Sequence, residues 1–226
     1  MAITFSDDSG DAKPPNPQKL DSYLKAVGLL FVGFPLIEQA LFELSGRLCG
    51  MTPLITRAVL ADMRIDAAMS AVNRVLEARK QEALLGTRNP KFEQTLSADI
   101  KYVFAQLGII NGVRNRLTHY GASPLDADEK VITNASRARS KETLFKISVS
   151  VTELKKMNTD IGRIVILLVH LQIRINRYPD PTVAVDFAER RKQLPWLYKS
   201  PLQGENPDKS RKKPPRRRPQ RTPSQG

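Results

Sequence analysis

Arg114 and His119 lie close together near the middle of the chain, and His119 is one of only two histidines among its 226 residues. Imidazole exchanges protons near neutral pH and guanidinium is a permanent cation, so the pair combines proton transfer with anion binding. Asn115 and His119 are four residues apart and are therefore neighbours on one helix face. Arg114 is offset from His119 by roughly 140° at 3.6 residues per turn. Either the last helical turn bends, or a second copy of the chain completes the site.

A long amphipathic helix must hold these residues. Apolar side chains recur upstream at steps of mostly three or four, which predicts one buried helical face; they are Phe92, Leu96, Ile100, Val103, Leu107, Ile110 and Leu117. Gly121 suits the left-handed position that ends many helices. The pattern predicts a helix from about Pro90 to His119, with His119 in its last turn.

Similar periodicity predicts three more long helices, at about residues 21–48, 52–85 and 152–177. Pro35 lies inside the first and is expected to kink it or split it near Phe34. Gly86 and Pro90 mark the break before the motif helix. We expect a further short helix at about residues 181–192.

The segment after Gly121 has a different character. Residues 130–135 and 143–151 are rich in β-branched and aromatic side chains, which predicts a small β-hairpin. Ser150 and Glu153 fit a capping box for the helix that follows. The sequence therefore predicts an all-α class: an antiparallel bundle of about four long helices, with a hairpin inserted before the last.

Both ends of the chain lack the apolar residues that a core requires. Residues 1–19 show no apolar periodicity, and Leu202 is the only aliphatic side chain from residue 199 onward. We expect a folded domain at residues 20–198 and disordered ends at residues 1–19 and 199–226.

The net charge of +13 is concentrated in the C-terminal end. Residues 199–226 hold nine Lys and Arg against two acidic residues, a charge of +7, which leaves +6 for the rest of the chain. Two clusters in this tail are candidates for binding RNA phosphates: Arg211, Lys212 and Lys213, then Arg216, Arg217 and Arg218. The alternative is a solvated tail without a specific partner.

Other features narrow the class of protein. One cysteine excludes an intramolecular disulfide and favours a reducing compartment. The longest apolar run, residues 26–37, is too short to span a bilayer, and the acidic, polar start does not fit a signal peptide. These features predict a cytoplasmic protein with no membrane partner. The sequence has two histidines, one cysteine and no clustered carboxylates, so we expect no metal site. It also has no glycine-rich phosphate-binding loop, so we expect no cofactor.

Arg114 and His119 resemble the Arg-x(4–6)-His motif of the HEPN superfamily, and Asn115 matches the polar residue often found after that arginine. The order of predicted elements over roughly residues 20–178 is also similar to HEPN domains. The resemblance implies a metal-independent endoribonuclease, active as a homodimer whose cleft is built from both protomers. It would act as a toxin or phage-defence effector, with an antitoxin or regulatory protein as a further partner.

The resemblance also implies a role for each residue. His119 would be the general acid or base, Arg114 would hold the scissile phosphate, and Asn115 would orient either of them. Arg116 and Tyr120 flank the motif and are candidates for binding substrate. The alternative is a non-catalytic HEPN-like dimeric module that binds RNA or a partner protein.

Glu38 interrupts the most apolar part of the first predicted helix. A buried carboxylate needs a partner, and Arg114 is a candidate, which would make Glu38 a supporting residue of the site. The alternative is that Glu38 lies on the solvent edge of its helix.

Overall fold

The computed structural model describes residues 17–60, 63–120, 129–133, 146–178 and 182–199. Within these ranges the fold is mostly helical, as predicted, with six α-helices: α1 (Pro17–Leu48), α2 (Pro53–Leu60), α3 (Ile65–Leu84), α4 (Pro90–Tyr120), α5 (Val151–Asn176) and α6 (Thr182–Gln193). Residues 17–19, predicted to be disordered, belong to α1. Residues 1–16 and 200–226 lie outside the described ranges.

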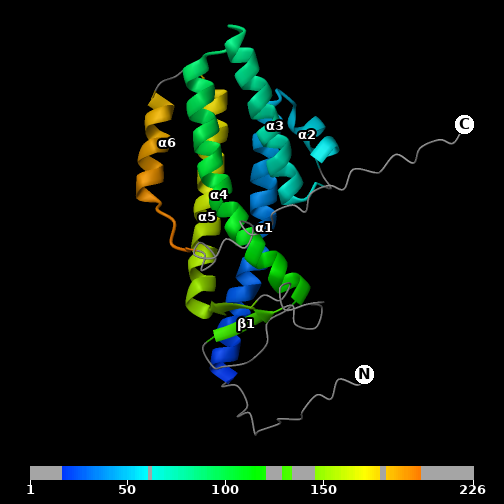
Figure 1. Cartoon of the computed structure of the whole chain (residues 1–226), viewed down its shortest axis with the longest axis vertical. Helices are drawn as coiled ribbons and strands as arrows, with labels where there is room; N and C mark the ends of the chain where they lie inside the picture. The colour runs from blue at the N-terminus through cyan, green and yellow to red at the C-terminus, as the bar shows by residue number, and fades with distance from the viewer. Residues whose placement is uncertain (1–16, 61–62, 121–128, 134–145, 179–181, 200–226) are drawn as a thin grey trace, which may run out of the picture.

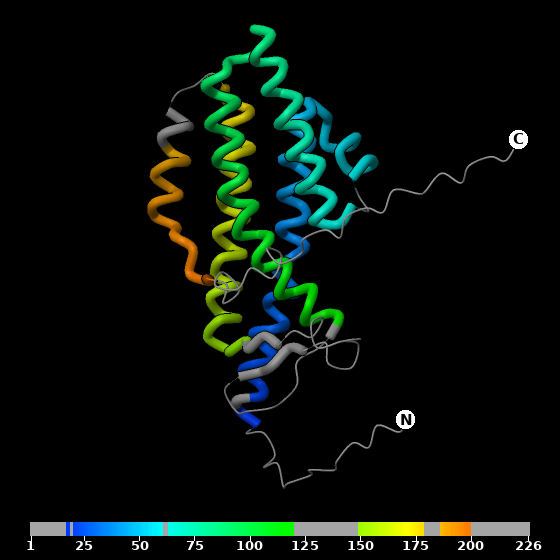
Figure 2. The backbone as a smooth tube through the Cα atoms, viewed as in Figure 1, coloured from blue at the N-terminus to red at the C-terminus, as the bar shows by residue number. Residues whose placement is uncertain are grey.

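Four helices, α1, α3, α4 and α5, enclose one hydrophobic core, and α6 lies along the outside of it (Figures 1 and 2). The core takes one face of each long helix, as the apolar periodicity requires. Its fully buried members include Leu30, Ile37 and Leu41 of α1, Leu96 and Leu107 of α4, and Ile164 and Leu168 of α5. Removal of these side chains from water is the main force that holds the helices together.

The two helices in most extensive contact, α1 and α5, run in the same direction. Asn158 Nδ2 donates to Ala26 O and Gln172 Nε2 donates to Ala40 O, each at 2.9 Å. Residue numbers therefore increase in the same direction along both helices. The prediction of antiparallel neighbours is therefore wrong for this pair.

The reversal that makes this possible lies between α1 and α3. A single helix was expected at residues 52–85, but α2 folds back against α1 and the chain turns again before α3. Gly46 allows the close approach, because a Cβ there would lie 2.1 Å from Oγ1 of Thr56 on α2. The break depends on this tertiary contact, which apolar periodicity does not encode.

The α3–α4 pair is antiparallel, as expected. Asn111 Nδ2 donates to Asp66 Oδ1 at 2.9 Å at one end of the pair. At the other end, the buried Arg79 and Glu93 form an ion pair, with Nη2 and Oε1 2.7 Å apart.

Pro35 lies inside α1, which the structure shows as one helix from Pro17 to Leu48. Of the two expected effects of Pro35, a kink or a split near Phe34, the split is absent from this described segment. Phe34 and Ile37, on either side of the proline, are 1% and 0% exposed. Their packing against the core holds the helix together across a residue that lacks an N–H donor.

Two strands, β1 (Glu129–Thr133) and β2 (Lys146–Ser150), pair antiparallel, with Glu129 opposite Ser150. The predicted turn between them falls within residues 134–145, outside the described ranges. The predicted capping box is confirmed: Ser150 Oγ accepts from the Glu153 N–H, and Glu153 Oε2 accepts from the Ser150 N–H. This cap fixes the start of α5 directly after β2.

Residues 194–198, here called the C-terminal strap, return from α6 to the surface between α4 and α5. Asp160 of α5 is fully buried and anchors the strap by accepting from the N–H groups of Leu197 and Tyr198, at 3.0 and 2.8 Å. Gln106 Nε2 of α4 donates to the same carboxylate at 2.9 Å. A buried carboxylate is stable only with such donors.

By length and composition alone, one helix of the described residues could cross a membrane: Leu20–Leu48 of α1, with a mean hydropathy of 1.6 in its most apolar window. Of that window, 33% is buried inside the protein, and core helices of soluble proteins meet the same criterion. α1 therefore has one face in the core and another that remains strongly apolar at the surface.

Candidate functional site

The motif occupies the C-terminal turns of α4, which Figure 1 draws across α1. Asn89 caps the start of α4 by accepting from the Phe92 N–H at 3.1 Å, and the helix continues to Tyr120. The predicted bounds are therefore confirmed to within one residue. Because α4 remains helical through Arg114 and His119, the roughly 140° offset between them holds. The last turn does not bend to bring the two side chains onto one face.

Arg114 is half-buried and lies against α1. Its guanidinium carbon is 4.9 Å from the centre of the Phe34 ring and 5.9 Å from that of Phe31. Cation–π contacts of this kind contribute about 0.5–2 kcal/mol, more when water is excluded. The Arg114 Nη1 atom also donates to Asn115 Oδ1 at 3.4 Å. The side chain is thus fixed by three neighbours.

The Nε atom of Arg114 is buried and has no hydrogen-bond partner among the described residues. An unsatisfied buried donor costs about 1–3 kcal/mol. This cost partly offsets the stabilisation that Arg114 gains from stacking on Phe34.

His119 lies in the last turn of α4, where its side chain is exposed. Thr118, its neighbour, donates its hydroxyl to the Arg114 carbonyl at 2.9 Å, which ties the end of the helix to the turn before it. The histidine is therefore accessible to a ligand, whereas Arg114 is packed against α1.

Arg116 lies on another flank of α4, near the C-terminal strap. Burial raises the pKa of Tyr198 to about 12; the Glu153 carboxylate adds to this rise, and the Arg116 charge opposes it. Arg116 is thus close to both groups. Tyr120 ends α4, and its side chain lies outside the described residues. The six tail residues predicted to bind RNA, within residues 211–218, also lie outside them.

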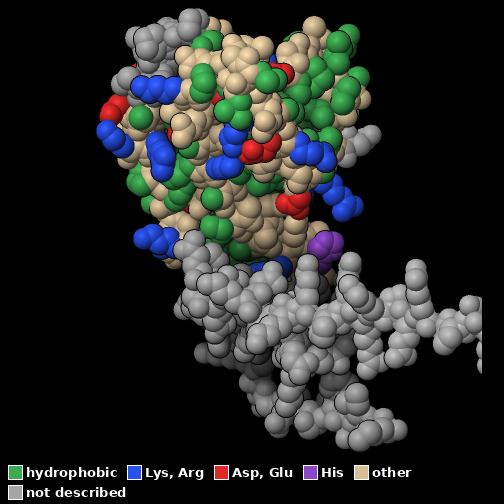
Figure 3. All heavy atoms as spheres, turned by 45° about the horizontal axis from the view of Figure 1, so that its top comes forward, with side chains coloured by type: hydrophobic (Ala, Val, Ile, Leu, Met, Phe, Trp, Pro, Cys, Tyr) green, Lys and Arg blue, Asp and Glu red, His purple; other side chains and the backbone are tan. Residues whose placement is uncertain are grey.

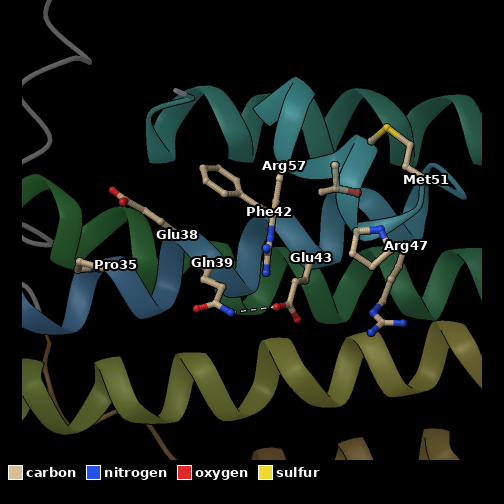
Figure 4. Close-up of a pocket in the computed structure, with 10 residues that line it drawn as sticks. Pro35, Glu38, Gln39, Phe42, Glu43, Arg47, Met51 and Arg57 are labelled. Carbon is tan, nitrogen blue, oxygen red and sulfur yellow. Dashed lines mark hydrogen bonds between the residues drawn. The ribbon is translucent and has the colours of Figure 1, made fainter. Parts of the chain in front are cut away.

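Glu38 lies at the edge of a groove of about 560 Å³ between α1 and α2. Figure 4 shows Glu38, Phe42 and Glu43 on α1, with Arg57 extending from α2 toward α1. Among the described residues, no hydrogen bond or ion pair joins Glu38 to Arg114. The structure therefore places Glu38 on the solvent edge of its helix, the second of the two predicted positions.

Sequence reasoning missed the aromatic rings beneath Arg114. Phe34 lies in the first predicted helix, and nothing local links it to a residue 80 positions later. The Asn111–Asp66 bond, one helical turn before Arg114, was also missed. Asn111 is 3% exposed, and a buried amide in an apolar helix face was a usable signal that a polar partner lies opposite.

Charges of both signs are interspersed with hydrophobic side chains on the face shown in Figure 3. Among the described residues, no group of three or more His, Cys, Asp or Glu side chains could hold a metal ion. The second histidine, His170, lies on α5, where burial and then the Arg190 charge lower its pKa. It belongs to a different surface from the motif.

The chain matches no family model, no curated protein and no solved structure.

Proposed function

We propose that the protein is a metal-independent endoribonuclease of HEPN type, located in the cytoplasm, with His119, Arg114 and Asn115 as its catalytic residues. The supporting observation is that α4 ends in an exposed His119, one and a half turns beyond an Arg114 that α1 holds in place. An arginine whose orientation is fixed before substrate arrives loses less entropy on binding a phosphate.

The reaction is attack of a ribose 2′-hydroxyl on the adjacent phosphorus. The P–O5′ bond breaks, leaving a 2′,3′-cyclic phosphate on one fragment and a 5′-hydroxyl on the other. The proton leaves the 2′-oxygen and a proton arrives at the 5′-oxygen, and His119 acts at one of these atoms. Arg114 binds the phosphoryl oxygens as negative charge develops on them. Asn115 keeps the guanidinium in position through its Oδ1.

Substrate binding extends beyond these residues. Arg116 is close enough to Tyr198, the last residue of the strap, for its charge to act on the Tyr198 hydroxyl. A tail with a charge of +7 attracts RNA to the protein. In the cell, such an enzyme serves as a toxin or phage-defence effector, restrained by an antitoxin or regulatory protein.

One observation favours a non-catalytic module as the second candidate. The guanidinium of Arg114 is engaged by Phe34 and Asn115, as a purely structural arginine would be. In this alternative the domain dimerises and binds RNA or a protein without cleaving either.

The test is incubation of the purified protein with mixed RNA in EDTA. Wild type is expected to give fragments ending in 2′,3′-cyclic phosphate, and His119→Ala and Arg114→Ala should each lose about 10²–10⁴-fold in rate. His170→Asn and Arg74→Ala are matched controls, because both lie away from α4's last turns and should keep wild-type rates. Full activity in His119→Ala would overturn the assignment; binding without cleavage by wild type would favour the module.

A mixing experiment decides whether two protomers share one cleft. If each cleft takes Arg114 from one chain and His119 from the other, mixed dimers of Arg114→Ala and His119→Ala contain one intact cleft and regain activity. If each protomer acts alone, the mixture remains inactive.

A further inference from the structure

Most of the exposed large hydrophobic side chains in the described part of the chain lie on three helices. Ten of fourteen belong to α1, α2 or α5: Leu24, Leu29, Val32 and Leu36; Leu54, Ile55 and Val59; Ile166, Val169 and Ile173. Soluble monomers rarely expose contiguous apolar patches above a few hundred Å², and larger ones mark interaction sites.

The centre of this surface is a stripe on α1. Leu29, Val32 and Leu36 follow one another at steps of three and four, so they share a helix face, and they are 61%, 70% and 57% exposed. A Cβ at Gly28 would meet nothing within 4 Å, so the surface is open beside them.

Helix α5 widens the stripe on one side. Gln172 contacts α1 through the Ala40 carbonyl. Ile173 is the next residue, roughly 100° further round the helix, and Val169 lies one turn before it. Both are exposed, at 37% and 40%, unlike the fully buried Leu171 on the core side. They therefore border the α1–α5 contact on its outer edge.

On the other side, α2 and the groove continue the surface. The groove lies along the C-terminal half of α1 and is lined by Pro35 and Phe42 as well as by Gln39, Glu43 and Arg47. Its volume of about 560 Å³ leaves room for apolar side chains of a partner.

Charged residues continue the same helix face at both ends of the stripe. Asp21 and Lys25 precede it and form an ion pair on the helix surface, with Nζ and Oδ2 2.9 Å apart. Glu43 and Arg47 follow it, also four residues apart, and all four side chains are exposed. If α1 meets a second α1 antiparallel, with the two-fold axis at residue 34, Asp21 faces Arg47 and Lys25 faces Glu43. If the helices were parallel and in register, each charge would face its own copy.

We propose that the partner of this surface is a second copy of the chain, whose α1 packs antiparallel on α1. Opposite charges then meet at both ends, and Val32 packs against Leu36 at the centre. The surface is self-complementary, as a two-fold interface requires. Each groove receives the N-terminal half of the partner helix, so apolar side chains such as Leu24 pack against Pro35 and Phe42 among its lining residues.

The arrangement of the surface suits a dimer interface. Standard interfaces bury about 800 Å² per partner, around a core that is more apolar than the rim. α1 supplies the apolar core over three turns, and the exposed side chains of α2 and α5 lie on either side of it.

This interface does not depend on the ribonuclease proposal and leaves the motif open. Arg114 packs on Phe34, which belongs to the buried face of α1, whereas Val32 belongs to the exposed face. The two motifs therefore lie on the outer flanks of the helix pair. With this interface alone, the mixing experiment above should show no recovery of activity.

Sedimentation of the full chain tests the proposal first. Wild type should be a dimer, and Val32→Glu should raise the dimer dissociation constant by roughly 100-fold or more, because a charge would be buried at the centre. Leu85→Glu is the matched control: Leu85 is 80% exposed but lies at the end of α3, away from this surface. Circular dichroism checks that each variant remains helical.

Charge reversal tests the direction of the helices. Lys25→Glu and Glu43→Lys should each weaken the dimer, and the double variant should recover most of the affinity, because Lys25 faces Glu43 only in the antiparallel pairing. Lys91→Glu, an exposed charge change on α4, is the control and should leave the dimer intact.

Spin labels measure the geometry directly. In a Cys49→Ser background, a label at Ser22→Cys should give an inter-protomer distance of roughly 36 Å, because the two positions are 24 residues apart along antiparallel helices. Parallel helices would give roughly 10 Å.

Three results would overturn the proposal: a wild-type monomer at about 100 µM, a dimer that tolerates Val32→Glu, or the short label distance. A monomer that binds anionic phospholipid vesicles through Val32 would show instead that the surface contacts lipid.

Discussion

The guanidinium carbon of Arg114 lies 4.9 Å from the centre of the Phe34 ring, which joins the motif of α4 to the buried face of α1. The contact connects residues far apart in sequence and orients the only arginine of the proposed catalytic set. The core and the site therefore share a side chain, and a change in the core should affect the chemistry.

Phe34→Leu should lower both stability and activity. Loss of ring volume and of the cation–π contact should cost about 1–3 kcal/mol, and an arginine that is no longer held should cleave RNA more slowly at saturating substrate. Ile37→Val is the control, because Ile37 is equally buried on α1 and should cost about 0.5–1.5 kcal/mol without slowing cleavage. Urea denaturation and kcat measurements check both; equal kcat in the two variants would contradict the link.

Arg79→Met should be among the most destabilising single changes. Arg79 donates Nε and Nη2 to Glu93 at 2.9 and 2.7 Å and Nη1 to the Leu48 carbonyl at 2.9 Å, and both side chains are buried. Removal of one partner from a buried ion pair costs about 3–5 kcal/mol. The double variant Arg79→Met with Glu93→Leu should recover much of the loss in urea denaturation. No recovery would mean that the Leu48 bond dominates.

Asp160→Asn should release the C-terminal strap. The amide has one acceptor oxygen where the carboxylate accepts from Leu197, Tyr198 and Gln106, so we expect a loss of about 2–4 kcal/mol. Trp196, the only tryptophan, stacks on Tyr102 at 5.1 Å between ring centres, so its fluorescence should report the release. Asp186→Asn, an exposed change on α6, should leave the spectrum unaltered.

Stability should fall in alkaline solution. Burial raises the pKa of Tyr23 and of Tyr198 to about 12, above the ordinary value of 10. The folded state therefore retains protons that the unfolded chain releases, so this contribution is complete below pH 10 and is lost as the pH rises toward 12. Tyr198→Phe should flatten the decline in the free energy of unfolding between these limits. An unchanged slope would show that other groups cause it.

Deletion of residues 200–226 should weaken RNA binding without unfolding the domain. If about four basic residues of the tail engage phosphates, the slope of log affinity against log salt should change by roughly 3. Cleavage at saturating RNA should survive, because the proposed catalytic groups lie before residue 121. Binding titrations at several salt concentrations measure the slope, and identical slopes would show that the folded domain holds RNA alone.

Local signals predicted some elements closely. Ser150 and Glu153 lie three residues apart, so their capping box was visible in the sequence and fixes the start of α5. The start of α4 was similarly marked by Pro90 and by the onset of the apolar period. Each of these boundaries is decided within a few residues, which is the range over which sequence patterns are informative.

The features of the fold and site that the sequence did not predict depend on tertiary contacts. The fold-back of α2 depends on Gly46 beneath Thr56, and the parallel direction of α1 and α5 follows from it. The place of Arg114 depends on a ring 80 residues earlier. For Glu38 the sequence allowed either a buried position paired with Arg114 or a position on the solvent edge of its helix. Periodicity alone does not show what lies opposite a helix edge.

The pairing of α1 with α5 has a consequence for synthesis of the chain. Ala26 and Asn158, which bond across the pair, are 132 residues apart. At about 5–20 residues per second, α1 emerges from the ribosome roughly 7–26 s before the helix that buries it. During that interval the face of α1 that packs against α5 has no final partner, and nascent chains on neighbouring ribosomes expose the same segment. Production of this protein should therefore depend on chaperones that shield hydrophobic helices, and faster translation of residues 49–150 should reduce its aggregation.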